Sequence, residues 1–448
     1  MTTTITLDPA TRVEGHLKIK IEVADGKVQT AFSSGTMFRG FESLVVGKDP
    51  RDASHITQRV CGVCPISHGI ASCLAVEAAS DHQLPPNARL VRNLIQGANF
   101  IESHIFHFYH LSLLSYIEGP PKAPWTPSYR TDLRLSPIDN QRMVDSYLKA
   151  LTARRETSEM AAVLAGKFPH AATLECGGVS GAVSADAITK FGHYLDEVQA
   201  FIDDVYLEDV DLLAKTYGDY LQIGRGYGNL LAFGALDGLF RGGRVVDGES
   251  AVQAVEPTAI IEHKTSSWYD GTAGNPAEGS MQPNADKATA YSWIQAPRYD
   301  NAPYECGPLA RMWVNGEYRS GVSVMDRHRA RALEASKIAK ETRTWLSQID
   351  PAAPFYTACV VPSSGSGTGL TEAPRGALGH WIRLEAGLVA AYQIVTPTCW
   401  NCSPRDDRGL AGPLEKALEG TPVANPAEPV EVLRVVQSYD PCLACAVH

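Results

Sequence analysis

Two Cys-x-x-Cys pairs near opposite ends of the sequence constrain the fold of this 448-residue chain more than any other feature. The first pair is Cys61 and Cys64, and the second is Cys442 and Cys445. Each pair places two sulfurs close enough to chelate one metal ion or to form a redox dithiol. Four thiolates brought together would carry a large negative charge, so the two pairs would require a cation. Their spacing fits structural zinc and also other soft or borderline metals.

A third pair, Cys399 and Cys402, has the same spacing. Two interpretations are open: the two thiols are small buried apolar groups, which we favour, or they form an oxidisable pair. The other cysteines are single residues without the spacing of an iron–sulfur cluster motif: Cys73, Cys176, Cys306 and Cys359. Ten cysteines are far too few for a disulfide scaffold of this length.

The composition is that of a folded globular protein, with 44% hydrophobic and 20% charged residues. The length suggests two or three domains. A net charge of −10 gives no support to binding of nucleic acid or an anionic membrane. The sequence contains no uncharged apolar run of about 18 residues that could span a bilayer. Its start has neither a basic nor an apolar signal region, so we expect no secretory signal.

The pattern of apolar residues predicts a helical core with strands at its edge. Residues 16–23 alternate between apolar and charged side chains, and Asp25-Gly26 follows, which predicts a β-hairpin. Apolar residues at three- and four-residue steps predict long helices over 87–118, 140–165, 188–205 and 326–349. Residues 264–308 are rich in Gly, Asn, Pro and Ser, which favours a surface excursion with short strands. We therefore predict an α+β protein with a multi-helix core bundle, peripheral β-hairpins and small sheets.

The residues around the outer cysteine pairs resemble the two metal-binding signatures of the nickel–iron hydrogenase large subunit. These segments are Arg59-Val-Cys-Gly-Val-Cys-Pro65 with His68, and Asp440-Pro-Cys-Leu-Ala-Cys-Ala-Val-His448. Further motifs of that family are Thr11-Arg-Val-Glu-Gly-His16, Phe38-Arg-Gly-Phe-Glu42, His107-Phe-Tyr-His110 and Glu372-Ala-Pro-Arg-Gly-Ala377. All occur in the family's order, so the resemblance spans essentially the whole chain. The overall pattern and shortness are nearest to the nickel–iron–selenium subclass, which has selenocysteine where this sequence has Cys442.

The resemblance implies a metal set. Cys61 and Cys442 would be terminal nickel ligands, and Cys64 and Cys445 would bridge nickel to an iron that carries cyanide and carbon monoxide. A second site, for magnesium or iron, would be formed by Glu42, His448 and the backbone carbonyl of Ile394. In the family a protease removes a short tail after this histidine, so the chain resembles a mature subunit.

The resemblance also implies roles for residues around the metals. Glu14 would receive a proton from the terminal thiolate of Cys442. Arg375, paired with Asp440, would lie above the metals and contact a cyanide. The other residues expected around the nickel–iron group are Pro374, Thr398, which would bind the second cyanide, and His68, which would not ligate.

Each of these residues also has an ordinary interpretation. Glu14 and Glu42 could be solvated surface acids, Arg375 could form a surface ion pair, and His68 could be a hydrogen-bonded core residue. Three histidines at three-residue steps on one predicted helix fit packing beneath the centre better than a metal site: His104, His107 and His110.

Three further features of the sequence are a glycine-rich run, a serine at position 115 and the third cysteine pair. The glycine-rich run Gly365-Ser-Gly-Thr-Gly369 has neither the spacing nor the following lysine of a nucleotide-binding loop, so we reject that role. Ser115 stands where family members usually carry an Asp, which puts that part of the hydrogen-bond network in doubt. The family also normally has non-thiol residues at the positions of Cys399 and Cys402.

The function that the resemblance implies is the reaction H2 ⇌ 2H+ + 2e−, with electrons passed to a partner, the iron–sulfur small subunit. Two alternatives are a quinone-reducing or structural subunit of an assembly similar to complex I, and a zinc-stabilised structural subunit. We expect no cluster and no membrane span in this chain. Localisation would follow the partner: periplasmic or membrane-associated through the small subunit, with a cytoplasmic location as the alternative.

The chain would then divide into four regions of one intertwined catalytic unit. Residues 1–60 would form the hairpin region and the lead-in to the first metal motif, and residues 61–240 the helical core. Residues 241–325 would form the excursion of loops and short strands. Residues 326–448 would supply a helix and the C-terminal metal-binding region.

Overall fold

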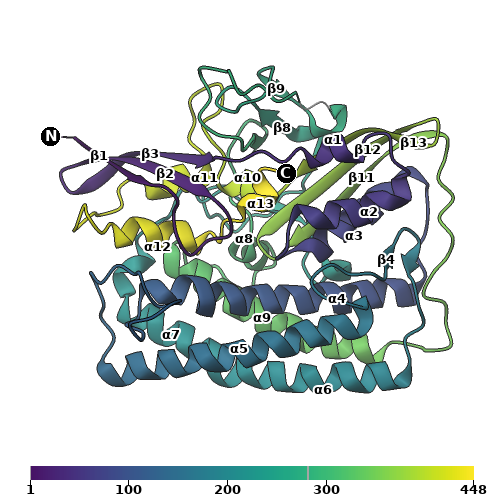
Figure 1. The fold of residues 1–448 in the computed structure, drawn as a ribbon, viewed down its shortest axis with the longest axis horizontal. Coiled ribbons are helices and arrows are strands. Elements are labelled where there is room, and N and C mark those ends of the chain that lie inside the picture. The colour runs from purple at the N-terminus through teal and green to yellow at the C-terminus, as the bar shows by residue number, and fades with distance from the viewer. Residues whose placement is uncertain (1, 280–281) are drawn as a thin grey trace.

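The computed structural model describes residues 2–279 and 282–448. Long helices form one layer, and small antiparallel sheets with the C-terminal segment lie on top of it (Figure 1). The predicted α+β class is confirmed. Within the described residues, no helix combines the length and the apolar character needed to cross a membrane.

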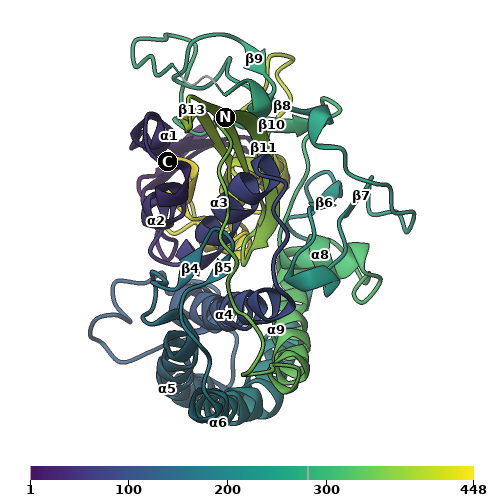
Figure 2. The same ribbon diagram turned by 90° about the vertical axis from the view of Figure 1, so that its right-hand side faces the viewer.

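The helical layer contains the long helices expected from the sequence. These are α4 (Pro86–Ile105), α5 (Pro137–Ala165), α6 (Ala185–Phe201) and α9 (Val324–Ser347); the shorter α7 (Leu207–Thr216), which also lies in this layer, was not predicted. Figure 2 shows most of this layer end-on. The predicted helix over 87–118 leaves α-helical geometry at Phe106, where a π-helical turn begins. Side chains of Ser136 and Ser323 cap the first backbone N–H groups of α5 and α9, which explains where these helices start.

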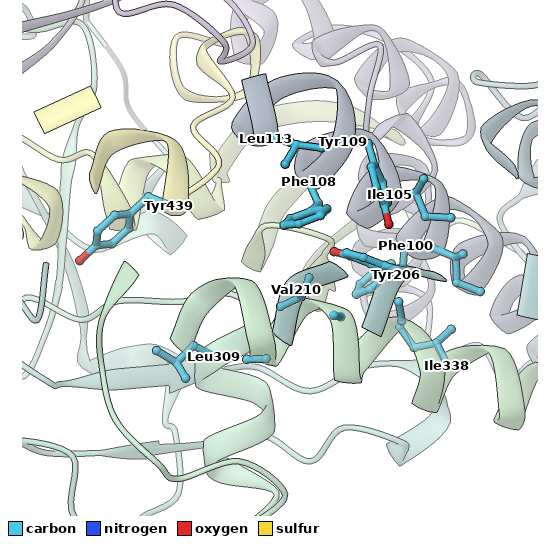
Figure 3. Close-up of a cluster of buried hydrophobic side chains, with 14 of the residues drawn as sticks. Phe100, Ile105, Phe108, Tyr109, Leu113, Tyr206, Val210, Leu309, Ile338 and Tyr439 are labelled. Atoms are coloured by element: carbon cyan, nitrogen blue, oxygen red, sulfur yellow. The ribbon is translucent and has the colours of Figure 1, made fainter. Parts of the chain in front are cut away.

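The apolar core of the helical layer joins helices that are distant in the sequence. Phe100 of α4 and Ile338 of α9 are fully buried in it, Tyr206 enters it from the π-helical turn between α6 and α7, and Val210 enters it from α7. Figure 3 shows this cluster, with side chains converging from several helices. Burial of such side chains contributes about 1.5–3 kcal/mol each, which fixes the layer as a rigid platform.

The N-terminal sheet confirms the predicted hairpin. It has the order β1 (Thr3–Leu7), β2 (Leu17–Ala24), β3 (Lys27–Gly35), and all pairings are antiparallel. Asp25 and Gly26 form the two-residue turn with φ of 52° and 72°, as an Asp-Gly hairpin turn requires. The strand β1 was not predicted.

A second three-stranded sheet was missed by the sequence analysis. It consists of β11 (Ser364–Ala373), β12 (Gly376–Glu385) and β13 (Leu388–Val395), and α3 (Pro65–Ala79) packs on β11. A Cβ atom at Gly367 or Gly369 would lie 2.0 Å from a backbone oxygen of α3. The glycine-rich run is therefore a strand surface that lets a helix backbone approach, which agrees with the rejection of a nucleotide loop.

The excursion carries the expected short strands. They are β8 (Ile260–His263), β9 (Ala273–Gly274) and β10 (Ala296–Tyr299), and they form one sheet. Residues 280 and 281 of this predicted region lie outside the described residues, as does residue 1 of the hairpin region. The remaining elements are α1 (Phe41–Val45), α2 (Ala53–Thr57), α8 (Pro308–Val314), α10 (Pro397–Asn401), α11 (Pro413–Leu418), α12 (Val430–Ser438), α13 (Leu443–Ala446), β4 (Leu174–Glu175), β5 (Gly178–Val179), β6 (Leu230–Ala232) and β7 (Gly243–Val245). The boundaries of the four predicted regions stay predictions.

Candidate metal centre

The four cysteines of the outer pairs meet in the interior. Their Sγ atoms all lie within 4.8 Å of one another, and all four residues are buried. Cys61 and Cys442 are separated by 3.4 Å between sulfurs, Cys64 and Cys445 by 3.3 Å, and Cys442 and Cys445 by 3.2 Å. These separations are far longer than the roughly 2.05 Å of a disulfide, so the thiols are free. The structure thus brings together the four residues that the spacing alone could only pair.

Two helix N-termini, those of α3 and the short α13, meet at the thiols. Cys64 lies immediately before α3, and Cys442 immediately before α13. At the N-terminus of a helix the backbone N–H groups favour negative charge, and thiolates are stabilised there. The N–H groups of Val63 and Cys64 point at the Cys61 sulfur from 3.2 and 3.3 Å.

The close packing of four ionisable thiols favours a bound cation. Hydrogen bonds from the other thiols, led by Cys442, lower the pKa of Cys61 well below its usual value. Burial and the neighbouring sulfurs raise the pKa of Cys445 well above the usual value. Neighbouring thiolates repel one another, so ionisation of several of these thiols needs positive charge among the sulfurs. A compact, buried set of four thiols fits a soft or borderline metal such as nickel.

Glu14 lies against the second cysteine pair. Its backbone pairs with residues 441–443 as a parallel bridge: its N–H donates to the Pro441 carbonyl and its carbonyl accepts from Leu443. Its carboxylate oxygen Oε2 lies 3.2 Å from Cys442 Sγ and accepts a hydrogen bond of 2.9 Å from the Ala444 N–H. Glu14 is half-buried, so this carboxylate connects the thiol cluster with the protein surface.

Arg375 is buried beside the cluster and paired with Asp440. Its Nη2 lies 2.9 Å from Asp440 Oδ1, and its Nε donates to the Asp440 carbonyl over 2.9 Å. Burial alone would lower the pKa of Arg375, but Asp440 and the nearby thiols outweigh it and raise the pKa well above the usual value. The guanidinium therefore carries a permanent positive charge next to the sulfurs.

Thr398, Pro374 and His68 lie close to the same cluster. The Thr398 hydroxyl accepts a hydrogen bond of 3.0 Å from the Cys442 N–H, and Pro374 is buried in the turn that carries Arg375. His68 Nε2 lies 3.6 Å from Cys445 Sγ. Burial lowers the pKa of His68 to about 4, so its imidazole is neutral.

The other side of His68 leads to residues that the sequence analysis did not identify. His68 Nδ1 lies 3.1 Å from His380 Nε2, and His380 Nδ1 lies 2.8 Å from the Tyr392 hydroxyl. Both residues come from the missed sheet, in strands β12 and β13. No local motif marks them, because their link with His68 exists only in the folded chain.

Glu42 and His448 form a second buried group. Glu42 Oε1 and His448 Nε2 are 2.8 Å apart, while both carboxylate oxygens of Glu42 lack a hydrogen bond of good geometry. Ile394 lies in β13, against which α1, the helix of Glu42, packs. Glu262, missed by the sequence analysis, is also buried here, and burial raises its pKa to about 8. A cation would bind the buried carboxylate oxygens of Glu42, which are the kind of ligand that a hard metal ion prefers.

The profile of the nickel-dependent hydrogenase family matches residues 39–120 and 118–448. The chain belongs to this family. A second profile, described as HoxL-like, matches residues 4–34.

Individual relatives of the hydrogenase family cover the chain from end to end. It is 41% identical to the periplasmic NiFeSe hydrogenase large subunit of Desulfomicrobium baculatum over 99% of this chain and 94% of that one. It is 31% identical to the hydrogenase-2 large chain of Escherichia coli K12, over 100% of this chain and 97% of that one. The solved Ni-Fe-Se hydrogenase from D. vulgaris Hildenborough superposes with a TM-score of 0.97 at 40% identity, over 100% of both chains.

In this hydrogenase-family chain, His104 at the end of α4 and the motif His107–His110 in the π-helical turn after it have packing contacts. His104 Nε2 lies 2.8 Å from Glu334 Oε1, His107 Nε2 donates to the Gln437 carbonyl over 2.7 Å, and the His110 ring packs edge-on against Tyr147. The three histidines have separate partners, as packing requires. Ser115, at the position of the usual Asp, offers its carbonyl to Arg434 at 2.7 Å, so Arg434 is bound by backbone there.

The third cysteine pair of this hydrogenase-family chain also fits packing. Cys399 Sγ donates to the Ala446 carbonyl at 3.6 Å. Burial raises the pKa of Cys399 to about 12 and raises the pKa of Cys402 further, so both thiols are protonated. Their surroundings support the interpretation as buried apolar groups.

Proposed function

We propose that this chain is the catalytic large subunit of a hydrogenase that catalyses H2 ⇌ 2H+ + 2e−. The observation that carries the proposal is the buried four-thiol cluster with the Glu14 carboxylate in contact with Cys442. Dihydrogen is apolar and a very weak acid, so its cleavage needs a Lewis acid and a nearby base. When bound by the four cysteines, a nickel–iron group with carbonyl and cyanide ligands would supply the Lewis acid.

The Cys442 sulfur and Glu14 would handle the proton. The sulfur would take the proton from dihydrogen, and Glu14 Oε2 is near enough, at 3.2 Å, to receive it. The Ala444 N–H holds that same oxygen in place. A pocket of about 270 Å³ lined by Glu14, His16, Arg39 and Arg59 opens beside it and gives the proton a route to solvent.

Arg375, Thr398 and Pro374 would hold the diatomic ligands. The Arg375 guanidinium has donors for one cyanide and a charge that matches the anionic cluster, while its pairing with Asp440 fixes its orientation. The Thr398 hydroxyl can donate to the second cyanide because it already accepts from the Cys442 N–H. Neutral His68 would donate or accept at Cys445 without adding charge.

Glu42, His448 and the Ile394 carbonyl would bind magnesium or iron at the second site. The buried carboxylate oxygens of Glu42 support this assignment, since they lack a hydrogen bond of good geometry and burying such a group is costly. His448 Nδ1 also binds the Cys445 carbonyl at 2.5 Å, so a cation at this site would steady the turn that carries Cys445.

The electrons would leave to an iron–sulfur small subunit. The single cysteines of this chain provide no cluster motif, so the conductor has to be supplied by a partner. Four exposed apolar side chains between residues 37 and 46 offer an apolar strip for docking, and the first of them lines the pocket at Glu14: Met37, Phe38, Leu44 and Val46. Arg39 anchors this strip to the thiol cluster because its guanidinium donates to the carbonyls of Arg59 and Ala444.

Metal analysis and infrared spectroscopy of the purified protein with its partner test the proposal. We expect nickel together with iron, and the bands of iron-bound carbonyl and cyanide. Zinc alone would establish the structural alternative. Absence of both metals and of the bands would favour a subunit similar to that of complex I, although that subunit lacks the full four-cysteine set seen here.

A further inference from the structure

Arg311 of α8 is fully buried, and two of its guanidinium nitrogens donate to backbone carbonyls that directly precede Arg375. Its Nη1 donates to the Ala373 carbonyl over 3.1 Å, and its Nη2 donates to the Pro374 carbonyl over 2.8 Å. Two carboxylates neutralise it: Glu334, with contacts of 2.8 and 2.5 Å, and Glu372, with a contact of 2.6 Å.

The two carbonyls belong to a tight turn. Ala373 pairs with Gly376 across β11 and β12, so Pro374 and Arg375 are the only two residues of the hairpin loop. The ladder ends at that pair, and the loop therefore depends on other contacts for its exact orientation. Arg311 grips the loop from the side of α8, where the backbone of Gly307 also packs closely against Arg375 and Gly376.

The carboxylates that hold Arg311 are themselves fixed. Burial alone would raise the pKa of Glu334, but Arg311 and His104 outweigh it and lower the pKa to about 2. Glu372 accepts a hydrogen bond of 2.6 Å from the Phe233 N–H with its other oxygen. Burial outweighs Arg311 and raises the pKa of Glu372 to about 7. The two acidic side chains thus hold the guanidinium behind the loop by fixed hydrogen bonds, in a geometry that a lysine could not reproduce.

We propose that Arg311 is a positioning residue, which sets the place of the Arg375 guanidinium over the thiol cluster by binding the two loop carbonyls. This inference rests on the proposed hydrogenase function. It predicts that Arg311 affects turnover only through Arg375. A displacement of about 1 Å at a catalytic group costs up to roughly 100-fold in rate, so the effect should be measurable.

A double-mutant cycle tests the proposal in the complete enzyme with its small subunit. We expect Arg311→Lys to lower the rate of hydrogen oxidation about tenfold, and Arg375→Lys about 100-fold. When both changes are combined, the rate should equal that of Arg375→Lys alone within about twofold, because neighbours that act through one group are non-additive. Additive losses in the double variant would overturn the proposal.

Arg298 provides the matched control. It is also fully buried, binds a carboxylate of Asp406 at 3.2 Å, and donates to the carbonyls of Pro404 and Leu410 at 3.1 and 3.2 Å. Arg298→Lys should therefore impose a similar structural disturbance, and its effect should add to that of Arg375→Lys.

Nickel content and infrared spectra supply a readout besides activity. Arg311→Lys should keep its nickel and should shift the cyanide bands, whereas Arg298→Lys should leave the bands in place. Unshifted bands in Arg311→Lys would overturn the proposal, while unmodified enzyme without bands or turnover would overturn the proposed function instead. If Arg311→Lys does not fold, Glu372→Gln takes its place in the same cycle, with coupling to Arg375→Lys expected and additivity contradicting it.

Discussion

The pairs Cys442/Cys445 and Cys399/Cys402 share their spacing, their burial and a place on a short helix, yet the two regions around them differ. Around the first pair lie two more thiols, the Glu14 carboxylate and the Arg375 guanidinium. Around the second lie apolar side chains, the Thr396 hydroxyl and a backbone carbonyl. The sulfurs of the first region can share charge and protons, whereas those of the second stay neutral. The Cys-x-x-Cys spacing allows a pair to bind a metal, but the surrounding residues determine whether the pair is a metal ligand or packs as a buried apolar group.

The difference between the two cysteine pairs is tested most directly by exchanging one sulfur for oxygen. Cys442→Ser should abolish both nickel retention and hydrogen turnover, because a hydroxyl is a poor nickel ligand. Cys399→Ser is the matched control and should keep its nickel. Metal analysis measures the nickel content, and a hydrogen-oxidation assay measures turnover. Normal nickel content and turnover in Cys442→Ser would contradict the metal assignment.

A smaller effect is expected from the carboxylate that only the first region possesses. Glu14→Gln keeps the size but removes the exchangeable proton, so turnover should fall about 100-fold while the carbonyl and cyanide bands remain. Glu14→Asp should recover part of the rate, and Glu22→Gln on β2 should change nothing. An unmodified rate in Glu14→Gln would make Glu14 an ordinary acid, and loss of the bands would give it a role in assembly.

Shortening the Cys399 side chain should lower the stability of the protein without changing its metal content. Cys399→Ala loses a buried sulfur and its hydrogen bond to Ala446, which costs about 1–2 kcal/mol. Thermal unfolding should therefore begin at a lower temperature with nickel content unchanged. A metal-free Cys399→Ala protein would show that the two regions are not separate.

The smallest effect is expected from oxidants and alkylating reagents. At pH 8 a thiol with a pKa of about 12 is almost entirely protonated, so Cys399 should react only after unfolding. Mass spectrometry of the folded protein after peroxide should find Cys399 and Cys402 as free thiols. A disulfide between them that thiols reverse would restore the oxidisable-pair interpretation.

The sequence predicts those parts of the fold whose signals are local. Asp25-Gly26 between alternating strands defines the hairpin, and serine caps with apolar periodicity define α5 and α9. The four ligand cysteines can be identified for a similar reason, because each pair is a contiguous motif. Their meeting point, however, follows only from the resemblance or from the structure.

The parts that could not be predicted depend on contacts between distant segments. Strand β11 carries glycines where apolar residues would normally mark a strand, because it packs on the backbone of α3. His380 and Arg311 sit in no motif, and their roles appear only when β12 lies beside α3 and α8 lies beside the β11–β12 turn. Such residues have to be found from the fold.

The bridge between Glu14 and residues 441–443 has a consequence for how the chain assembles. Contacts between residues 428 positions apart close nearly the whole chain into a loop, at an entropic cost of about 5 kcal/mol. A metal bound by both outer cysteine pairs would act as a cross-link across that loop, and metal–thiolate sites contribute about 10–16 kcal/mol in small zinc peptides. Residues 442–445 emerge from the ribosome long after Cys61 and Cys64. The interior around the metals can therefore close only after residues 442–445 have been made, and a metal held by both pairs would couple its own binding to chain closure.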